Sequence, residues 1–82
     1  MFEIEFSESA EKQLYKLEKH IQIRIVSTLD RIRVRPYPFV KKLVGSPYFR
    51  LRVGDYRVIL NIEKEKLLIF VIELGHRSNI YD

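Results

Sequence analysis

The chain has 82 residues and a mass of 9.9 kDa, which leaves room for one small domain over residues 1–82 and excludes a nucleotide-binding α/β enzyme. Apolar residues make up 46% and charged residues 32%, a balance that excludes a disordered chain, and the net charge is +4. The chain has no cysteine, no basic signal peptide and no apolar run near the ~20 residues that span a bilayer, so we expect a cytoplasmic protein without disulfides or membrane contact.

The N-terminal half predicts one strand followed by two helical segments. Apolar and acidic residues alternate over residues 2–6, as in a half-buried strand. Ser7 can cap a helix, and apolar residues then recur every three or four positions through residues 10–32, until two prolines end the helical pattern. One long helix and a helical hairpin both fit this pattern. The usual length of helices favours a hairpin with its turn near Lys19 or His20.

The C-terminal half predicts three more strands. Alternation runs over residues 48–53 and 56–62, and Gly54-Asp55 between them is typical of a two-residue hairpin turn. The segment 67–74 is apolar on both sides, which predicts a central strand. The order of elements predicts an α+β domain, with an N-terminal strand and a helical hairpin packed on one face of a mostly antiparallel four-stranded sheet.

The hairpin turn also predicts which side chains share a face of the sheet. Pairing Val53 with Tyr56 places Arg52 opposite Arg57, while apolar side chains gather on the other face. The face with the arginines carries Tyr48, Arg50, Arg52, Arg57, Ile59 and Asn61. Facing arginines repel each other, and a bound phosphate would remove that repulsion. The pattern therefore predicts a phosphate-binding surface; an arginine face that only keeps the sheet from aggregating is the alternative.

Positive charge is concentrated in the middle of the chain. Residues 31–57 hold eight Lys and Arg against one acid, a net of +7, whereas residues 1–30 sum to −2 and residues 58–82 to −1. Such a segment is typical of proteins that bind phosphates, although a solvated basic face would give the same count. Lys41 and Lys42 lie within it and are candidate phosphate contacts.

The C-terminal tail can add to the arginine-bearing face. Gly75 allows the chain to turn away from the sheet, which would bring His76, Arg77 and Tyr81 beside its open end. His76 and His20 are far apart in sequence, with no cluster of carboxylates near either, so we expect no metal site and no cofactor.

The run from Tyr48 to Leu60, together with Gly75-His76-Arg77 and Tyr81, resembles the RelE/ParE superfamily of toxins from type II toxin-antitoxin systems. The likeness covers almost the whole chain. It implies a RelE-like fold and, in the RelE branch, an mRNA interferase: an endoribonuclease that cuts messenger RNA in the ribosomal A site and inhibits translation. It also implies a cognate RelB-like antitoxin, which holds the toxin inactive in a higher-order protein complex.

The resemblance also implies roles for individual residues. The candidate catalytic residues are Arg50 at the scissile region, Arg57 on the phosphate charge, Arg77 beyond the Gly-x motif, and Tyr81, which orients or activates the nucleophile. The candidate RNA contacts are Arg52, Tyr48, His76, Lys41 and Lys42. Where the best-studied branch has a lysine two residues before the Arg50 position, this chain has Tyr48, so the general base is unassigned.

The chemistry of these residues predicts a poor nuclease in isolation. RNA can be cut by its own 2'-hydroxyl group if a protein aligns the atoms, neutralises the developing charge and moves two protons. Arginine and tyrosine serve the first two tasks but transfer protons poorly, because their pKa values lie above ~12 and near ~10. We therefore expect a requirement for the ribosome, with His76 as one candidate acid or base. A ParE-like inhibitor of DNA gyrase and a non-catalytic RNA-binding module are the alternative functions.

Overall fold

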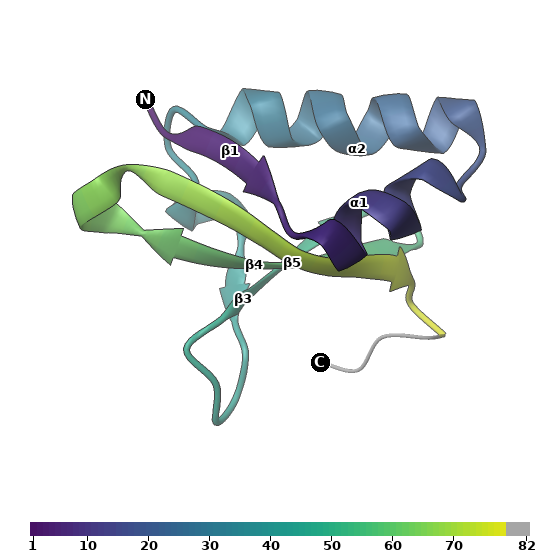
Figure 1. The fold of residues 1–82 in the computed structure, drawn as a ribbon. Helices are drawn as coiled ribbons and strands as arrows, with labels where there is room; N and C mark the ends of the chain where they lie inside the picture. The colour runs from purple at the N-terminus through teal and green to yellow at the C-terminus, as the bar shows by residue number, and fades with distance from the viewer. Residues whose placement is uncertain (79–82) are drawn as a thin grey trace.

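The computed structural model describes residues 1–78 as two helices packed on one face of a five-stranded sheet (Figure 1). The sheet order is β1-β5-β4-β3-β2, with β1 parallel to β5 and all other neighbours antiparallel. The helices and strands are β1 (Glu3–Phe6), α1 (Glu8–Tyr15), α2 (Lys19–Ile32), β2 (Lys41–Lys42), β3 (Phe49–Val53), β4 (Tyr56–Glu63) and β5 (Leu68–His76). Single turns of 3-10 helix, η1 (Tyr37–Phe39) and η2 (Lys64–Lys66), precede β2 and β5.

The prediction of an α+β domain with a helical hairpin on one face is confirmed, and the sheet has five strands rather than four. The fifth strand is β2, whose two residues pair with β3. A pairing of two residues is too short to show alternation in the sequence, so only the folded chain reveals it. The helical turn occupies residues 16–18, directly before the expected position near Lys19.

Ser7 begins α1 and also fixes it to the sheet. Its Oγ accepts a hydrogen bond from the backbone N–H of Ala10 at 2.9 Å, as a helix N-cap does, and donates one to the carbonyl oxygen of Ile72 at 2.8 Å. Gln13, farther along the same helix, accepts a hydrogen bond from the backbone N–H of Leu74 at 2.8 Å. Two side chains of α1 therefore satisfy backbone groups of β5 beyond the end of its pairing with β1.

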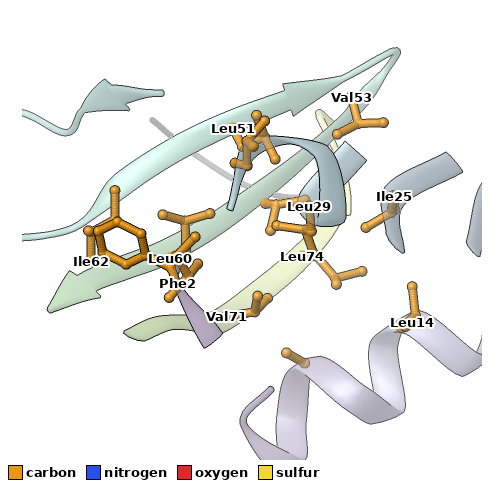
Figure 2. Packing of buried hydrophobic residues seen from close by; sticks show 14 residues of the cluster. Phe2, Leu14, Ile25, Leu29, Leu51, Val53, Leu60, Ile62, Val71 and Leu74 are labelled. Carbon is orange, nitrogen blue, oxygen red and sulfur yellow. The ribbon is translucent and has the colours of Figure 1, made fainter. Parts of the chain in front are cut away.

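The hydrophobic core lies between the helices and the sheet, as Figure 2 shows. Its fully buried side chains come from α2 on one side and from β4 and β5 on the other: Ile25, Leu29, Ile32, Val58, Leu60, Ile69, Val71 and Leu74. The strand β5 lies between β1 and β4, which confirms its predicted interior position. Neither helix of residues 1–78 has the length and apolar character that crossing a membrane requires.

The pairing of β4 with β5 contains one β-bulge, which changes the face of the sheet on which the residues of β5 after Ile72 lie. Ile59 pairs with Glu73 and Leu60 pairs with Val71, so Ile72 is an extra residue on β5. After this bulge the strand continues through Gly75 to His76, whereas the sequence predicted a turn away from the sheet at Gly75. Gly75 is still part of the sheet, where it pairs with Arg57 of β4.

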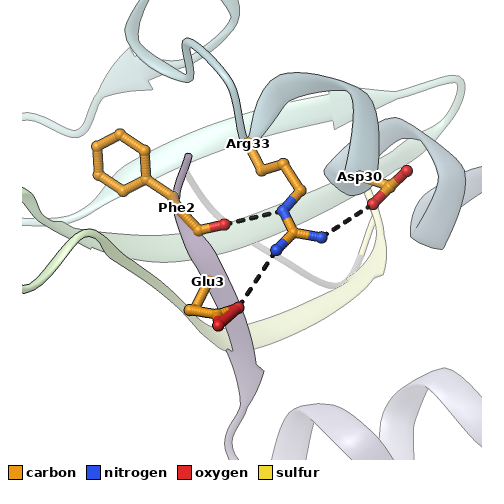
Figure 3. Close-up of polar contacts among 4 residues, drawn as sticks. All are labelled: Phe2, Glu3, Asp30 and Arg33. Carbon is orange, nitrogen blue, oxygen red and sulfur yellow. Dashed lines mark hydrogen bonds and ion pairs between the residues drawn. The ribbon is translucent and has the colours of Figure 1, made fainter.

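Arg33 belongs to the basic middle segment of the sequence, but its side chain connects two elements of the fold. It follows α2, and its Nε donates a hydrogen bond to the carbonyl oxygen of Phe2 at 2.8 Å (Figure 3). Its two terminal nitrogens contact Asp30 and Glu3, each at 3.2 Å. The end of α2 is thereby attached to the start of β1. Part of the charge that the sequence analysis assigned to phosphate binding therefore stabilises the fold.

We expect Arg33→Ala to lower the free energy of unfolding by about 1–3 kcal/mol, since a hydrogen bond to a charged group contributes about 1.5–3 kcal/mol and partly exposed ion pairs contribute less. Urea denaturation of the purified protein measures this difference. Lys12→Ala is the matched control, because it removes an exposed contact of 3.4 Å with Glu8 and should cost under about 0.5 kcal/mol. Equal stability of the two variants would contradict a structural role for Arg33.

Candidate functional site

The hairpin of β3 and β4 has the register that the sequence predicted. Val53 pairs with Tyr56 and Arg52 pairs with Arg57, as the two-residue turn requires. Gly54 in the turn has φ of +59°, and a Cβ atom there would lie 3.0 Å from a guanidinium nitrogen of Arg24 on α2. The positive φ favours glycine at this turn, whereas the guanidinium group of Arg24 is the end of a flexible side chain that could move to admit a Cβ atom.

The strand pairings place three arginines on the face of the sheet that the helices do not cover. Arg50 and Arg52 alternate with buried Leu51 on β3, and Arg57 faces Arg52 from β4. We call the surface formed by Arg50, Arg52 and Arg57 the arginine face. Arg52 is exposed, while Arg50 and Arg57 are half-buried. Three cations on two adjacent strands, about 4.8 Å apart, can contact one phosphodiester group and its neighbours.

Arg77 adjoins this face at the hairpin end. Its backbone N–H donates a hydrogen bond to the carbonyl oxygen of Asp55 in the turn at 2.9 Å. Its own carbonyl oxygen accepts one from Nη1 of Arg57 at 3.4 Å. These two contacts bring the backbone of Arg77 beside Arg57, and Arg50 lies on the same face as Arg57, two pairs farther along the hairpin. Tyr81 lies outside the described residues.

Ile59 forms an apolar floor within the arginine face. It pairs with Arg50 on one side and with Glu73 on the other, and only 6% of it is exposed although it is not part of the core between helices and sheet. A dry floor strengthens the interaction between nearby cations and a phosphate, because the local dielectric constant is lower than that of water.

The two lysines that the sequence grouped lie on opposite faces of β2. Lys41 pairs with Arg50 and therefore shares its face, whereas Lys42 pairs with Phe49, whose side chain packs against the core. Both lysines line a shallow pocket of about 180 Å³ with Arg50. Tyr48 precedes Phe49, so alternation places it on the arginine face, where it is 38% exposed.

His76 lies on the opposite face from the one that the sequence predicted. It pairs with Tyr56, and the two rings make an edge-to-face contact with centroids 5.4 Å apart on the side of the sheet that packs against the core. Its Nδ1 lies 2.9 Å from Oγ of Ser78. The cause is the continuation of β5 through Gly75, which keeps the alternation of side chains intact up to His76.

Sequence reasoning missed Glu73. It pairs with Ile59, is exposed, and lies on the arginine-bearing side of β5, next to the strand edge that Gln13 of α1 covers. Simple alternation from Ile69 and Val71 would have turned Glu73 toward the core; the bulge at Ile72 reverses this and turns Leu74 inward instead. The available signal was that a lone acid in an apolar strand must face solvent.

The charged residues described on this surface are mostly basic, which suits the binding of an anion. Residues 1–78 contain no group of three or more His, Cys, Asp or Glu that could hold a metal ion. The charged residues of the arginine face and its rim are Arg50, Arg52, Arg57, Lys41, Arg77 and Glu73. One acid among five bases suits a ligand with closely spaced negative charges, such as a nucleic acid backbone.

Comparison with known proteins gives a family, relatives and similar structures. The family described as ParE toxin of type II toxin-antitoxin system, parDE, matches residues 4–81. The mRNA interferase toxin RelE of Escherichia coli (strain K12) is 30% identical over 83 residues, covering 95% of this chain and 87% of that protein.

Two solved complexes contain similar folds. The RelE–RelB complex of Pyrococcus horikoshii matches with 27% identity and a TM-score of 0.82, covering 96% of this chain and 98% of the other. The toxin–antitoxin complex RelBE2 of Mycobacterium tuberculosis matches with 23% identity and a TM-score of 0.87, covering 95% and 93%. The second likeness concerns the fold alone.

Proposed function

The chain belongs to the RelE/ParE family of type II toxins, and we propose that it is an endoribonuclease of the RelE kind, which cuts messenger RNA on the ribosome and so inhibits translation. The observation that carries this proposal is the placement of Arg50, Arg52 and Arg57 on one uncovered face, with the backbone of Arg77 beside Arg57. The E. coli relative, whose name states an mRNA interferase, supports the same activity.

The proposed reaction is an in-line attack of a 2'-hydroxyl group on the adjacent phosphorus. Arg50 and Arg57 bind the scissile phosphate and stabilise its extra negative charge in the transition state, because guanidinium groups present fixed donors that match phosphate oxygens. Arg77, whose backbone lies beside Arg57, binds the RNA backbone next to the scissile phosphate. Arg52 and Lys41 bind flanking phosphates, and we keep Tyr81 as the residue that orients the nucleophile.

We propose that the ribosome is required because the arginine face binds phosphate but does not by itself align a flexible RNA. Holding the attacking oxygen near ~3–3.5 Å and in line with the leaving group can account for several kcal/mol of the barrier. A flat sheet face offers few contacts to fix the ribose, whereas a message held in the ribosomal A site is already positioned. Activity of this kind takes place in the cytoplasm, where translation occurs.

The test compares purified protein on naked RNA with the same protein on ribosomes programmed with that RNA. We expect cleavage only on ribosomes, at defined positions in the A-site codon, mapped by primer extension. Comparable cleavage of both substrates would contradict the ribosome requirement. Absence of cleavage on both, with inhibition of gyrase supercoiling in a parallel assay, would favour the ParE-like gyrase inhibitor that the sequence left as an alternative.

We propose that a RelB-like antitoxin neutralises this toxin. The RelE of Pyrococcus horikoshii was solved with RelB, and this chain matches it along 96% of its length. A basic face is best covered by acidic residues of a partner, and an apolar stripe on α2 that includes Ile23 and Val26, 57% and 46% exposed, can bind a partner helix. We expect the pair to form a higher-order complex.

A further inference from the structure

The arginine face needs a proton acceptor that its cations cannot provide. Attack by a 2'-hydroxyl group requires its proton to leave, and arginine and lysine are already protonated at neutral pH. The sequence analysis offered His76 for this task, but His76 lies with Tyr56 on the face that packs against the core. Glu73 lies on the arginine face and is exposed. An ionised carboxylate accepts hydrogen bonds from hydroxyl groups.

The strand register places Glu73 at the right separation from the arginines. Arg50, Ile59 and Glu73 form one row across β3, β4 and β5. Neighbouring strands lie about 4.8 Å apart, so the Cα atoms of Arg50 and Glu73 are separated by roughly 10 Å, with buried Ile59 between them. Arg57 is a diagonal neighbour of Glu73 at about 7–8 Å, since Arg57 pairs with Gly75. A phosphate bound by Arg50 and Arg57 therefore has its ribose within reach of Glu73.

The other acids on or near this side of the sheet fit less well. Glu3 and Glu5 lie on the outer strand β1, opposite Leu68 and Phe70 and away from the arginines, and Glu3 contacts Arg33. Glu63 belongs to the same face but lies six residues from Arg57 along β4, roughly 20 Å away, and contacts Lys66 at 3.8 Å. Asp55 occupies the hairpin turn beyond the last strand pair. Among the acids of residues 1–78, Glu73 is therefore the one placed inside the row of phosphate-binding groups.

From this placement we propose that Glu73 is the general base of the cleavage reaction. This inference rests on the proposed nuclease function. The 2'-O–H bond breaks and its proton passes to a carboxylate oxygen of Glu73, while the 2'-oxygen bonds to phosphorus. The bond between phosphorus and the 5'-oxygen breaks, and the leaving oxygen takes a proton from solvent. The products are a 2',3'-cyclic phosphate and a 5'-hydroxyl end, and Glu73 then returns its proton to water.

A purely electrostatic role for Glu73 predicts the opposite result of mutation. A carboxylate repels phosphate, so a surface that only binds RNA would bind it more tightly after loss of this charge. Glu73→Gln should then cut as fast as the parent protein or faster. A general base, by contrast, typically contributes about 10²–10⁴-fold to a rate.

The experiment measures single-turnover cleavage on programmed ribosomes at saturating toxin. We expect Glu73→Gln to cut about 10²–10⁴-fold more slowly while binding ribosomes as well as the parent protein or better. The matched control is Glu5→Gln on β1, which removes the same charge from the same face far from the arginines and should leave the rate within about twofold. Thermal unfolding of both variants checks that each is folded.

A substrate with sulfur in place of the leaving 5'-oxygen identifies which proton is involved. A thiolate leaves without protonation, so the slow rate of Glu73→Gln should persist on this substrate if Glu73 removes the 2'-proton. Recovery of the rate would make Glu73 a general acid and overturn the proposal, as would full activity of Glu73→Gln on ordinary RNA or an equal loss in Glu5→Gln. If the parent protein itself fails to cut on ribosomes, the proposed function fails instead.

Discussion

Arg57→Ala should abolish most cleavage on programmed ribosomes while leaving the protein folded. Removal of one preorganised donor to a developing anionic charge typically slows a reaction by about 10²–10³-fold, and Arg57 is the arginine that faces Arg52 and also contacts the backbone of Arg77. We expect the loss in the single-turnover rate at saturating toxin, with ribosome binding weakened by a few fold at most. Quantified primer extension gives the rate, and co-sedimentation with ribosomes gives the binding.

Two companion variants separate geometry from charge. Arg57→Lys keeps the charge but loses the planar pair of donors, and we expect it to recover only part of the rate. Arg31→Ala removes an arginine from the last turn of α2, in the helical layer on the other side of the sheet, and should cut at the parental rate. A similar loss in Arg31→Ala and Arg57→Ala would show that total charge, and not the arginine face, drives cleavage.

Leu60→Ala should destabilise the domain more than any surface substitution. Leu60 is fully buried on β4 beneath the helices, and truncation of such a side chain costs about 2–5 kcal/mol through lost burial and the cavity left behind (Figure 2). A domain of this size has about 4–12 kcal/mol of total stability at ~0.05–0.15 kcal/mol per residue. The substitution therefore removes a large share of it, which urea denaturation measures directly.

Ile23→Ala is the control for this substitution. Ile23 is 57% exposed on α2, and alanine is a better helix former than isoleucine, so we expect a change within about 0.5 kcal/mol. Addition of a neutralising antitoxin should raise the stability of both proteins through mass action. A loss below about 1 kcal/mol for Leu60→Ala would mean that the helices do not pack on β4 as the structure shows.

Most of the hairpin that bears the arginines could be predicted from local sequence. Gly54 and Asp55 define a two-residue turn, and a turn of that length leaves one register for the strands that it joins. The pairs from Val53–Tyr56 to Phe49–Leu60 follow from this register and are present, whereas Tyr48 lies before the first paired residue of β3. The short strand β2 could not be predicted, because two residues show no period, and the site roles of Tyr81 stay a prediction outside the described residues.

The sequence by itself determined the α+β class, the interior place of β5 and the meeting of Arg52 with Arg57, because periodicity and turn chemistry are local properties. Only the tertiary structure decided the faces on which Glu73 and His76 lie. One extra residue at Ile72 inverts the alternation of β5 and turns Glu73 outward, and the unbroken ladder at Gly75 then keeps His76 on the core side. The face on which a side chain lies depends on how its strand pairs with strands distant in sequence. No local sequence pattern shows where one strand of a pair carries an extra residue.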